Sequence, residues 1–420
     1  MEDSLRSGEP CLGEPDFRPT VLLLWLGYVG YYLGRANLAL ALPVLLKQYD
    51  IPYTLAGAVA TAGYVCYAVG QPVHGMLIDR FGAKPFFLLG LAVSAVANLA
   101  IGCMSAPVWM AVVWGINGFF QACGWPALVK VADAWLPARG RGRLMSVLAT
   151  SAHVGSVLSW AVASLMVIRF GWRYVFWVPA LAVGLVWVVS LLFLRERPAR
   201  SSVAAKLSEK EVLPFAQQVV QIVGNPQIRW TAFILACVNL IYNAVLAWLP
   251  TYLMDAGLAL ANVGWRSVAF PVTNAMGALL VGRLLDARGN GRQTGVLVLV
   301  QAGLALALSG LLLAQPSSIW ALVSLAMVGL CIAGANFLVT GPIPLMISMG
   351  SSQGFTVGII NGFGYVGASL GSFLTGWLVQ TSGWSSALRL WLVVALMAWA
   401  GAVRCCRSMT QRQITYGGVV

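Results

Sequence analysis

An arginine within an apolar stretch is the first residue of this chain that suggests chemistry. Arg35 lies inside residues 20–43, a run long enough to cross a bilayer as a helix. A cation at that depth costs about 3 kcal/mol or more unless it faces a cavity or a partner. The expected spans contain no carboxylate near their middle, so we expect Arg35 to bind a carboxylate or phosphate of an anionic ligand. The alternative is that Arg35 bonds to backbone carbonyls or pairs with a displaced aspartate.

Polar side chains on other expected helices could complete a site around this arginine. Tyr32 precedes Arg35 on the same helix face. The other candidates are Gln121, Trp125, Tyr242 and Tyr365. They suit a polar cavity, although interhelical hydrogen bonding would explain any one of them as well. His153 could carry protons, bind an anion when charged, or stay neutral and hydrogen-bonded. Lys130 is expected to extend to the membrane interface rather than to a ligand.

A charged turn follows the second expected helix and has a relative later in the chain. Its residues are Gly75, Asp79, Arg80, Gly82 and Lys84, and the related turn 207 residues later contains Asp286 and Arg288. Gly75 would allow close helix contact, and Asp79 could cap or pair with a neighbouring helix end. We interpret these turns as gating elements, against the simpler alternative of ordinary charged turns.

The elements that must position these residues are membrane-spanning helices. The chain has 420 residues, of which 59% are hydrophobic and 9% charged, too little charge to cover a soluble domain. Its long apolar runs lack the period of two that a membrane β-barrel needs. We predict an all-α membrane protein with twelve transmembrane helices, at residues 20–43, 55–78, 86–105, 108–131, 144–168, 173–194, 229–253, 262–285, 294–314, 318–345, 353–379 and 385–404.

The basic residues predict how these helices are oriented. With the N-terminus inside, cytoplasmic segments hold 19 of the 26 Lys and Arg residues and the other side holds five. The net charge of +13 therefore orients the chain in a bilayer and requires no nucleic-acid partner. We expect a multi-pass protein of a bacterial inner membrane with both termini in the cytoplasm. Residues 1–194 would form one six-helix bundle, 195–228 a cytoplasmic linker, and 229–420 a second bundle with a short cytoplasmic tail.

The two predicted bundles repeat each other in sequence. Pro43, expected to end helix 1, and Pro250 are 207 residues apart. His153-Val-Gly155 and Tyr365-Val-Gly367 are separated by 212, as are the Gly-Trp pairs that begin at residues 171 and 383. A repeated six-helix unit is typical of transporters whose substrate site lies between the halves near the membrane midplane.

Other kinds of chemistry find no support in the sequence. A Gly-Lys phosphate loop, a metal-ligand cluster and a nucleophile triad are all absent, so we expect neither an enzyme nor a cofactor. The eight cysteines are scattered, and we interpret them as small apolar residues rather than as disulfides or metal ligands. Cys405 and Cys406 follow the last expected span and could be acylated, although an inert pair is the simpler interpretation.

Several of these segments resemble the organophosphate:phosphate antiporters of the major facilitator superfamily. The run from Gly27 to Leu38, which contains Arg35, is similar to their helix 1. Residues 117–126, 151–155 and 248–253 are similar to helices 4, 5 and 7, and the turn 75–84 resembles the superfamily signature of loop 2–3. The resemblance implies the superfamily fold, with Arg35 as an anion ligand and His153 as a modulator of binding.

The resemblance fails at one position that bears on the substrate. Family members place a second arginine on helix 7 to form a pair that holds phosphate, whereas this chain has Tyr242 there. One cation in place of two should bind a dianionic phosphate much less well. A monoanionic, zwitterionic or polyhydroxylated solute fits better.

We therefore expect a secondary active transporter that moves a small organic anion or zwitterion by alternating access. It would act as a monomer and would couple to a counter-transported anion or a proton. One alternative is a proton-driven exporter of a metabolite, drug or siderophore, although the missing midplane carboxylate counts against simple proton coupling. Another is a membrane sensor of a sugar phosphate that does not transport.

Overall fold

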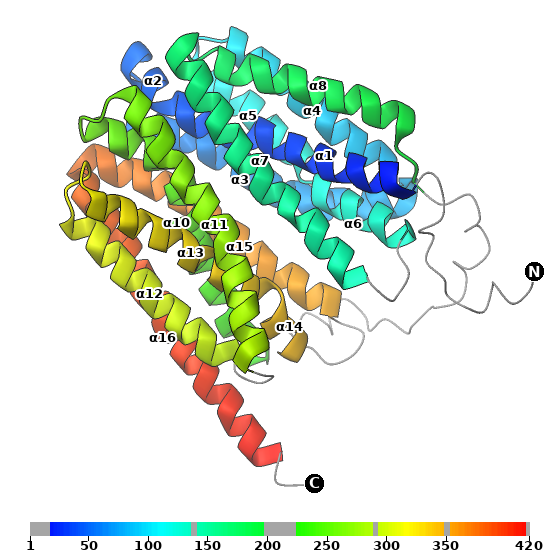
Figure 1. The fold of residues 1–420 in the computed structure, drawn as a ribbon, viewed down its shortest axis with the longest axis vertical. Coiled ribbons are helices and arrows are strands. Elements are labelled where there is room, and N and C mark those ends of the chain that lie inside the picture. The colour runs from blue at the N-terminus through cyan, green and yellow to red at the C-terminus, as the bar shows by residue number, and fades with distance from the viewer. Residues whose placement is uncertain (1–16, 136–140, 197–223, 289–292, 348–352, 417–420) are drawn as a thin grey trace, which may run out of the picture. The chain divides into compact units, whose positions relative to one another are not determined.

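The computed structural model describes residues 17–135, 141–196, 224–288, 293–347 and 353–416, and all the regular secondary structure within them is helical (Figure 1). Twelve transmembrane helices form two six-helix bundles, which confirms the predicted all-α fold. Nine helices among the described residues are long and apolar enough to cross a membrane by length and composition alone. The other spans are α3, the α5–α6 pair and the glycine-rich α15.

Unit 1 comprises residues 1–51 and 62–208. Its helices are α1 (Phe17–Ala36), α2 (Leu38–Tyr49), α3 (Tyr53–Phe81, from residue 62 onward), α4 (Lys84–Cys103), α5 (Pro107–Gln121), α6 (Gly124–Trp135), α7 (Arg141–Arg169) and α8 (Tyr174–Phe193). Helix α1 packs against α7 and α8, and α4 packs against α5 and α8 (Figure 1).

Unit 2 comprises residues 52–61, the start of α3, and residues 209–420. Its other helices are α10 (Pro226–Asp255), α11 (Leu260–Arg288), α12 (Gln293–Leu313), α13 (Ile319–Thr340), α14 (Pro342–Ile347), α15 (Gln353–Ser382) and α16 (Trp384–Tyr416). Helix α10 packs against α15 and α16, and α12 packs against α13 and α16. Most of the predicted linker 195–228 lies outside the described residues.

Three predicted spans are broken where a continuous helix was expected. The breaks fall at Asn37 between α1 and α2, at residues 122–123 between α5 and α6, and at Gly341 between α13 and α14. Pro126 explains the second break, because it has no N–H to give the Ala122 carbonyl, which accepts instead from Gln71 Nε2 at 3.4 Å.

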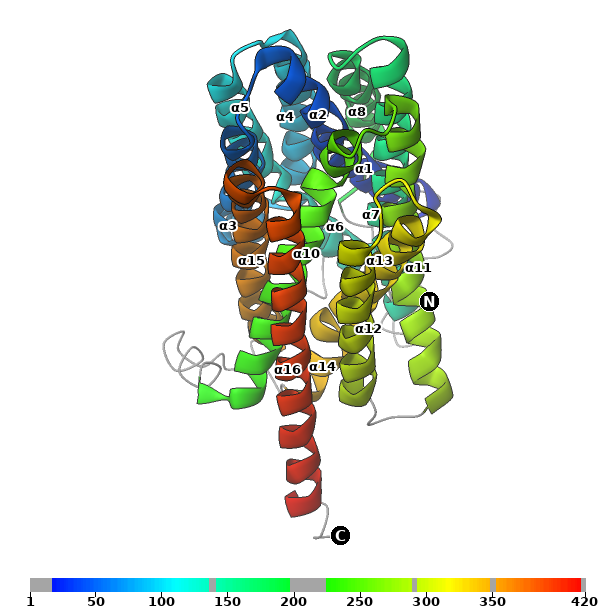
Figure 2. The same cartoon turned by 90° about the vertical axis from the view of Figure 1, so that its left-hand side faces the viewer.

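Two further expectations about helix ends are wrong. Pro43 does not end helix 1, because α2 continues to Tyr49; a proline costs one backbone hydrogen bond, which buried membrane helices tolerate. The last helix also runs beyond residue 404, so Cys405 and Cys406 lie within α16 rather than after it. Figure 2 shows α16 continuing past the ends of its neighbours α10 and α12.

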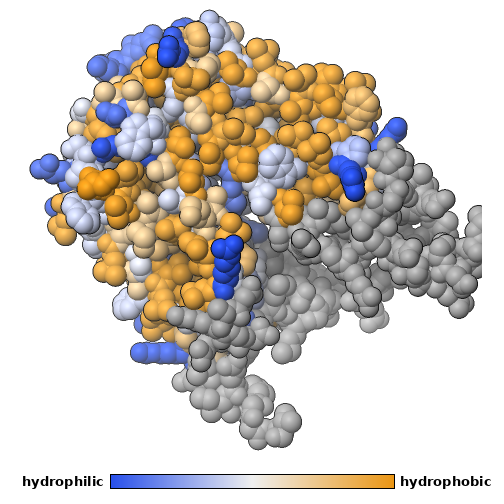
Figure 3. All heavy atoms as spheres, viewed as in Figure 1, coloured by the Kyte–Doolittle hydropathy of each residue, from blue (hydrophilic) through white to orange (hydrophobic). Residues whose placement is uncertain are grey.

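Large apolar side chains cover the outside of the helices as well as the inside. Leu181, Leu306 and Leu313 are 68%, 74% and 85% exposed, and most of the described surface in Figure 3 is hydrophobic. The cores contain fully buried aromatic residues, among them Trp160 in unit 1 and Trp248 in unit 2. Soluble monomers rarely expose such continuous apolar surface, so these faces are suited to lipid.

Close helix contacts recur at equivalent positions of the two units. A Cβ added at Gly155 of α7 would lie 2.9 Å from the Val29 carbonyl oxygen of α1, and one at Gly367 of α15 would overlap the Ala236 carbonyl oxygen of α10. Val29 and Ala236 are 207 residues apart, and the two glycines are 212 apart. The internal repeat predicted from sequence is therefore present in the packing.

A second pair of contacts aligns the fourth and tenth spans. A Cβ at Gly118 of α5 would overlap the Gly63 carbonyl of α3, and one at Gly329 of α13 would lie 3.0 Å from the Phe270 carbonyl oxygen of α11. The separations are 211 residues for the glycines and 207 for their partners. These offsets allow the two units to be compared residue by residue.

Candidate solute-binding site

Arg35 lies in the last turn of α1, beside the break at Asn37. The Gly34 carbonyl there accepts hydrogen bonds from Asn98 Nδ2 at 3.1 Å and from Asn117 Nδ2 at 3.0 Å. Asn37 Nδ2 in turn donates to Asn98 Oδ1 at 2.8 Å. Side-chain amides of α4 and α5 thus support backbone that a broken membrane helix would otherwise leave unsatisfied. Such breaks are where transporters place binding groups.

The Arg35 side chain is held by neutral groups of unit 1. Its Nε donates to Gln121 Oε1 at 2.6 Å. The guanidinium carbon lies 4.9 Å from the centre of the Tyr32 ring and 4.6 Å from that of Tyr67. Cation–π contacts and an amide oxygen therefore orient the guanidinium at the break.

Gln121, the last residue of α5, is itself held in one orientation. Its Nε2 donates to Ser94 Oγ at 2.8 Å, to Asn117 Oδ1 at 3.2 Å and to the Gly34 carbonyl at 3.2 Å. Because these acceptors fix the amide nitrogen, the Oε1 atom is directed toward Arg35. Sequence reasoning selected Gln121 as a ligand; in this geometry it also positions the arginine.

Aromatic rings extend the site from α1 to α6. The Tyr28 ring centre lies 5.6 Å from that of Tyr32 and 5.2 Å from that of Trp125, the second residue of α6. Tyr32 and Trp125 are only partly buried. The structure therefore brings four of the predicted residues, Arg35, Tyr32, Gln121 and Trp125, into one cluster of unit 1, which we call the arginine cluster.

His153 lies on α7, the helix that packs against α1 beside Tyr32. A Cβ added at Gly155, two residues on, would come within 2.6 Å of the Tyr32 Cβ. His153 is partly buried and makes no hydrogen bond among the described residues. No contact between His153 and Arg35 is described.

Tyr242 and Tyr365 lie in unit 2. The Tyr242 ring on α10 is 6.0 Å from the Phe270 ring on α11. Tyr365 lies on α15 next to Gly364, whose added Cβ would meet Asn239 Nδ2 at 2.6 Å. The 207 offset places Tyr242 at the position of Arg35, and the 211 offset places Ile332 at that of Gln121. Unit 2 therefore has a phenol and an alkyl group where unit 1 has a cation and an amide.

The charged turn after α3 is held by backbone contacts within unit 1. Gly82 has φ +92°, a conformation that favours glycine. The next amide, of Ala83, donates to Glu196 Oε1 at 2.6 Å, and Lys84 Nζ donates to the Leu191 carbonyl at 3.4 Å. Glu196 was not expected from sequence, because it lies 113 residues from Ala83, three residues after the end of α8.

Other expectations for the gating motif fare differently. A Cβ added at Gly75 would meet nothing within 4 Å, so the prediction of a close helix contact at Gly75 is wrong. The close contact is at Gly70 instead, whose added Cβ would lie against the Phe119 carbonyl oxygen. The Arg80 guanidinium carbon lies 5.2 Å from the centre of the Phe81 ring. Lys130 Nζ donates to the Ile78 carbonyl at 3.0 Å, at the end of α3. The side chains of Asp79, Asp286 and Arg288 lie outside the described residues.

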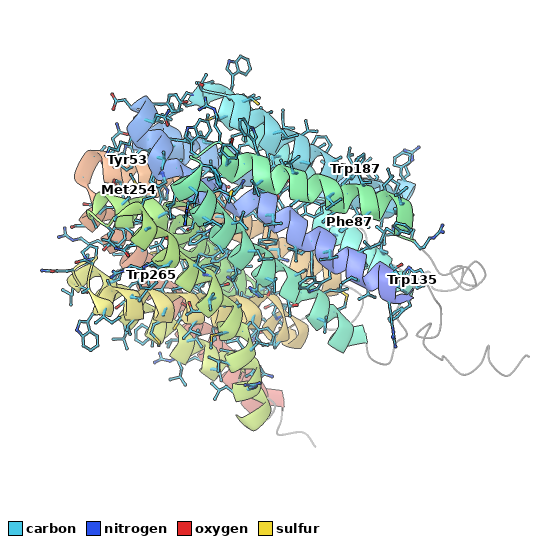
Figure 4. The ribbon with its side chains drawn as sticks, turned by 45° about the horizontal axis from the view of Figure 1, so that its top comes forward. Tyr53, Phe87, Trp135, Trp187, Met254 and Trp265 are labelled. Carbon is cyan, nitrogen blue, oxygen red and sulfur yellow. The ribbon has the colours of Figure 1, made fainter. Side chains whose placement is uncertain are left out.

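Sequence reasoning also missed a polar cluster at the end of α10. Asp255 Oδ2 accepts from Tyr53 Oη at 2.6 Å and from Trp384 Nε1 at 2.9 Å. Tyr53 also stacks on Trp248, with ring centres 6.0 Å apart, and Figure 4 shows it beside Met254 of α10. The partners lie 202 and 129 residues from Asp255, so no local pattern could have indicated them.

Comparison with known proteins identifies the family. The sequence pattern of the Major Facilitator Superfamily matches residues 24–352. The chain belongs to this superfamily. The superfamily comprises membrane transporters, and a transport function follows for this chain in general terms. The chain is also similar to a solved superfamily structure, a bacterial homolog of the human lysosomal transporter Spinster, with a TM-score of 0.81 at 14% identity, covering 95% of this chain and 98% of that one.

Curated relatives match along almost the whole length. The membrane sensor protein UhpC of Escherichia coli K12 is 26% identical, over 92% of this chain and 90% of its own. The glycerol-3-phosphate transporter of Bacillus subtilis 168 is 26% identical, over 89% of each chain. The hexuronate transporter of the same organism is 24% identical, over 93% of this chain and 94% of its own. These relatives agree with the organophosphate antiporter resemblance.

Proposed function

We propose that this chain is a secondary active transporter that moves a small organic anion or zwitterion by alternating access, with Arg35 as the anchor for the acidic group. The observation that carries the proposal is the placement of Arg35 at the broken end of α1. An amide oxygen and two phenol rings orient its guanidinium there. A carboxylate or phosphodiester offers two oxygens in the geometry that a guanidinium binds best.

The charge of the solute follows from the residue at position 242. A phosphate monoester carries close to two negative charges at neutral pH, and the related antiporters are expected to meet it with two arginines. Here Tyr242 replaces the second arginine. A hexuronate carries one carboxylate and several hydroxyls, so a solute of that kind matches one guanidinium better than glycerol-3-phosphate does. The hexuronate transporter among the relatives supports this choice.

The remaining predicted residues have roles in this proposal. Tyr32 and Trp125 would stack on the body of the solute, and Gln121 would hold Arg35. Tyr242 and Tyr365 would contribute to solute binding, and His153 would tune it. The turn at 75–84 and its relative with Asp286 and Arg288 would act in gating. The chain would work as a monomer in a bacterial inner membrane with both termini in the cytoplasm, exchanging its solute for an anion or coupling to a proton.

Exchange in reconstituted vesicles tests the proposal. Glucuronate, glycerol-3-phosphate and inorganic phosphate would each be loaded on one side, and counterflow of labelled solute measured. We expect glucuronate to exchange and the Arg35→Gln variant to lose most of this activity, whereas Arg35→Lys keeps part of it. Faster exchange of glycerol-3-phosphate or phosphate would show that the argument from Tyr242 is wrong. Unchanged solute affinity in Arg35→Gln would place the site elsewhere.

A membrane sensor is the second candidate, because one relative that matches along nearly the whole chain is the sensor UhpC. The same vesicles distinguish the two functions. Solute that stabilises the purified protein against heat and yet shows no counterflow would indicate a sensor. Saturable counterflow would exclude a purely sensory role.

A further inference from the structure

Three exposed arginines gather where α10 begins in unit 2. Arg229 lies in the first turn of α10, and Arg404 and Arg407 lie one turn apart on α16. The Arg404 guanidinium lies 5.3 Å from the centre of the Trp230 ring. Arg229 lies one turn before Phe233, which packs at Gly401 of α16, so the basic residues of both helices lie near this contact. We call Arg229, Trp230, Arg404 and Arg407 the basic surface.

Tight packing holds the basic surface in shape. A Cβ added at Gly401 of α16 would lie 3.3–3.5 Å from Ile234, Phe233 and Trp230 of α10. Cys405, one turn later on α16, is completely buried. The two helices therefore touch along the turns that carry the arginines, and the surface is a fixed feature of unit 2.

Positive charge at the basic surface has no acidic residue beside it in sequence. Residues 225–235 and 398–412 contain no aspartate or glutamate. The first turn of a helix also favours an anion, so Arg229 adds a cation where the backbone is already positive. Arginines in the end turns of membrane spans extend to the lipid headgroups, and tryptophan prefers the same interfacial depth.

We propose that the basic surface binds an anionic phospholipid. Arg404 and Arg407 would contact the headgroup phosphate, Arg229 would add attraction, and Trp230 would anchor the acyl–headgroup boundary. The site is separate from the arginine cluster and does not depend on the proposed function. Any solute that binds at Arg35 should leave it unaffected.

Titration of lipid into the full-length protein in detergent tests this proposal. Short-chain phosphatidylglycerol, short-chain phosphatidylcholine and inorganic phosphate would be added separately, and binding followed by native mass spectrometry and thermal unfolding. We expect phosphatidylglycerol to bind and stabilise more strongly than phosphatidylcholine. Each arginine near an anionic surface contributes about fivefold in affinity, so Arg404→Gln with Arg407→Gln should weaken phosphatidylglycerol binding about 25-fold.

A control double variant distinguishes a specific lipid site from a general effect of positive charge. Arg169→Gln with Arg389→Gln removes the same number of exposed charges from the ends of α7 and α16 that are predicted to lie on the other side of the membrane, and it should leave binding unchanged. Equal losses in the two double variants would overturn the proposal. So would equal binding of the two lipids, or competition by inorganic phosphate as effective as by phosphatidylglycerol.

Discussion

The two units share their helix contacts but differ at the positions equivalent to Arg35 and Gln121. Gly155 against Val29 in unit 1 and Gly367 against Ala236 in unit 2 are the same contact. At the neighbouring equivalent positions, unit 1 has Arg35 and Gln121 where unit 2 has Tyr242 and Ile332. The close contacts are present in both units, whereas the arginine at these positions is present in unit 1.

This difference teaches which features belong to packing and which to binding. Small residues that let backbones meet are needed in both units, because dispersion and close contact hold membrane helices together. Buried amides and a cation cost free energy in hydrocarbon unless something binds them. At the positions equivalent to Arg35 and Gln121 they are present in unit 1 alone, which is where we propose that the acidic part of a solute binds. The predictions below test that distinction.

The largest effect should follow from removing the cation of unit 1. Arg35→Gln is expected to weaken binding of a monoanionic solute on the order of 100-fold, because hydrogen bonds to charged groups contribute about 1.5–3 kcal/mol. Tyr242→Phe, the equivalent change in unit 2, should alter affinity only a few-fold. Calorimetric titration of both variants measures the ratio. Equal losses would remove the asymmetry on which the account depends.

A smaller loss is expected when the support of Arg35 is removed. Gln121→Leu deletes the oxygen that accepts from Arg35 Nε and should weaken solute binding about tenfold. Ile332→Leu, at the equivalent position of unit 2, conserves volume and should change little. Solute affinity and thermal stability would be measured together. A Gln121→Leu protein with wild-type affinity would show that Gln121 does not position the arginine.

Contacts shared by both units should respond alike. Gly155→Ala and Gly367→Ala each place a methyl group against backbone of the facing helix, and overpacking of this kind costs about 1–3 kcal/mol. Gly75→Ala is the control, because nothing lies within 4 Å of its added Cβ. Thermal unfolding in detergent should show both variants destabilised and the control near wild type. Loss in only one unit would mean that the contacts are not equivalent.

The smallest effect concerns the turns before α8 and α16. Gly171 and Gly383 have φ of +95° and +77°, so alanine at either should cost about 1–2 kcal/mol through backbone strain alone. Both turns are open, since neither added Cβ meets an atom within 4 Å. Matched decreases in unfolding temperature are expected, with Gly184→Ala inside α8 as an unstrained control. Unequal decreases would indicate that the turns differ.

The sequence alone was sufficient to predict the membrane-spanning segments and the internal repeat. Hydrophobic length identifies a membrane helix, and the offsets between Pro43 and Pro250 and between Gly155 and Gly367 recur in the packing. The break at Asn37 could not be predicted, because the Gly34 carbonyl beside it is satisfied by a donor from another helix, Asn98. Pro126 is a local signal for the break at residues 122–123, although the donor to the Ala122 carbonyl, Gln71, is not local.

The candidate site could also be predicted only in part from the sequence. Intramembrane charge indicated Arg35, and helical spacing placed Tyr32 beside it, because both signals are local. Non-local contacts could not be predicted. These are the hydrogen bonds from Gln121 to Ser94, from the Ala83 amide to Glu196, and from Tyr53 to Asp255. These pairs become neighbours only through folding.

The most direct test restores the second cation. Tyr242→Arg gives unit 2 the charge that Arg35 gives unit 1, and the measurement is the ratio of counterflow rates for glucuronate and glycerol-3-phosphate in reconstituted vesicles. We predict that the wild type favours glucuronate and that Tyr242→Arg shifts the ratio toward glycerol-3-phosphate by about tenfold or more, the contribution of one charged hydrogen bond. An unchanged ratio, or a wild type that already favours glycerol-3-phosphate, would contradict the claim that a single cation sets the charge of the solute.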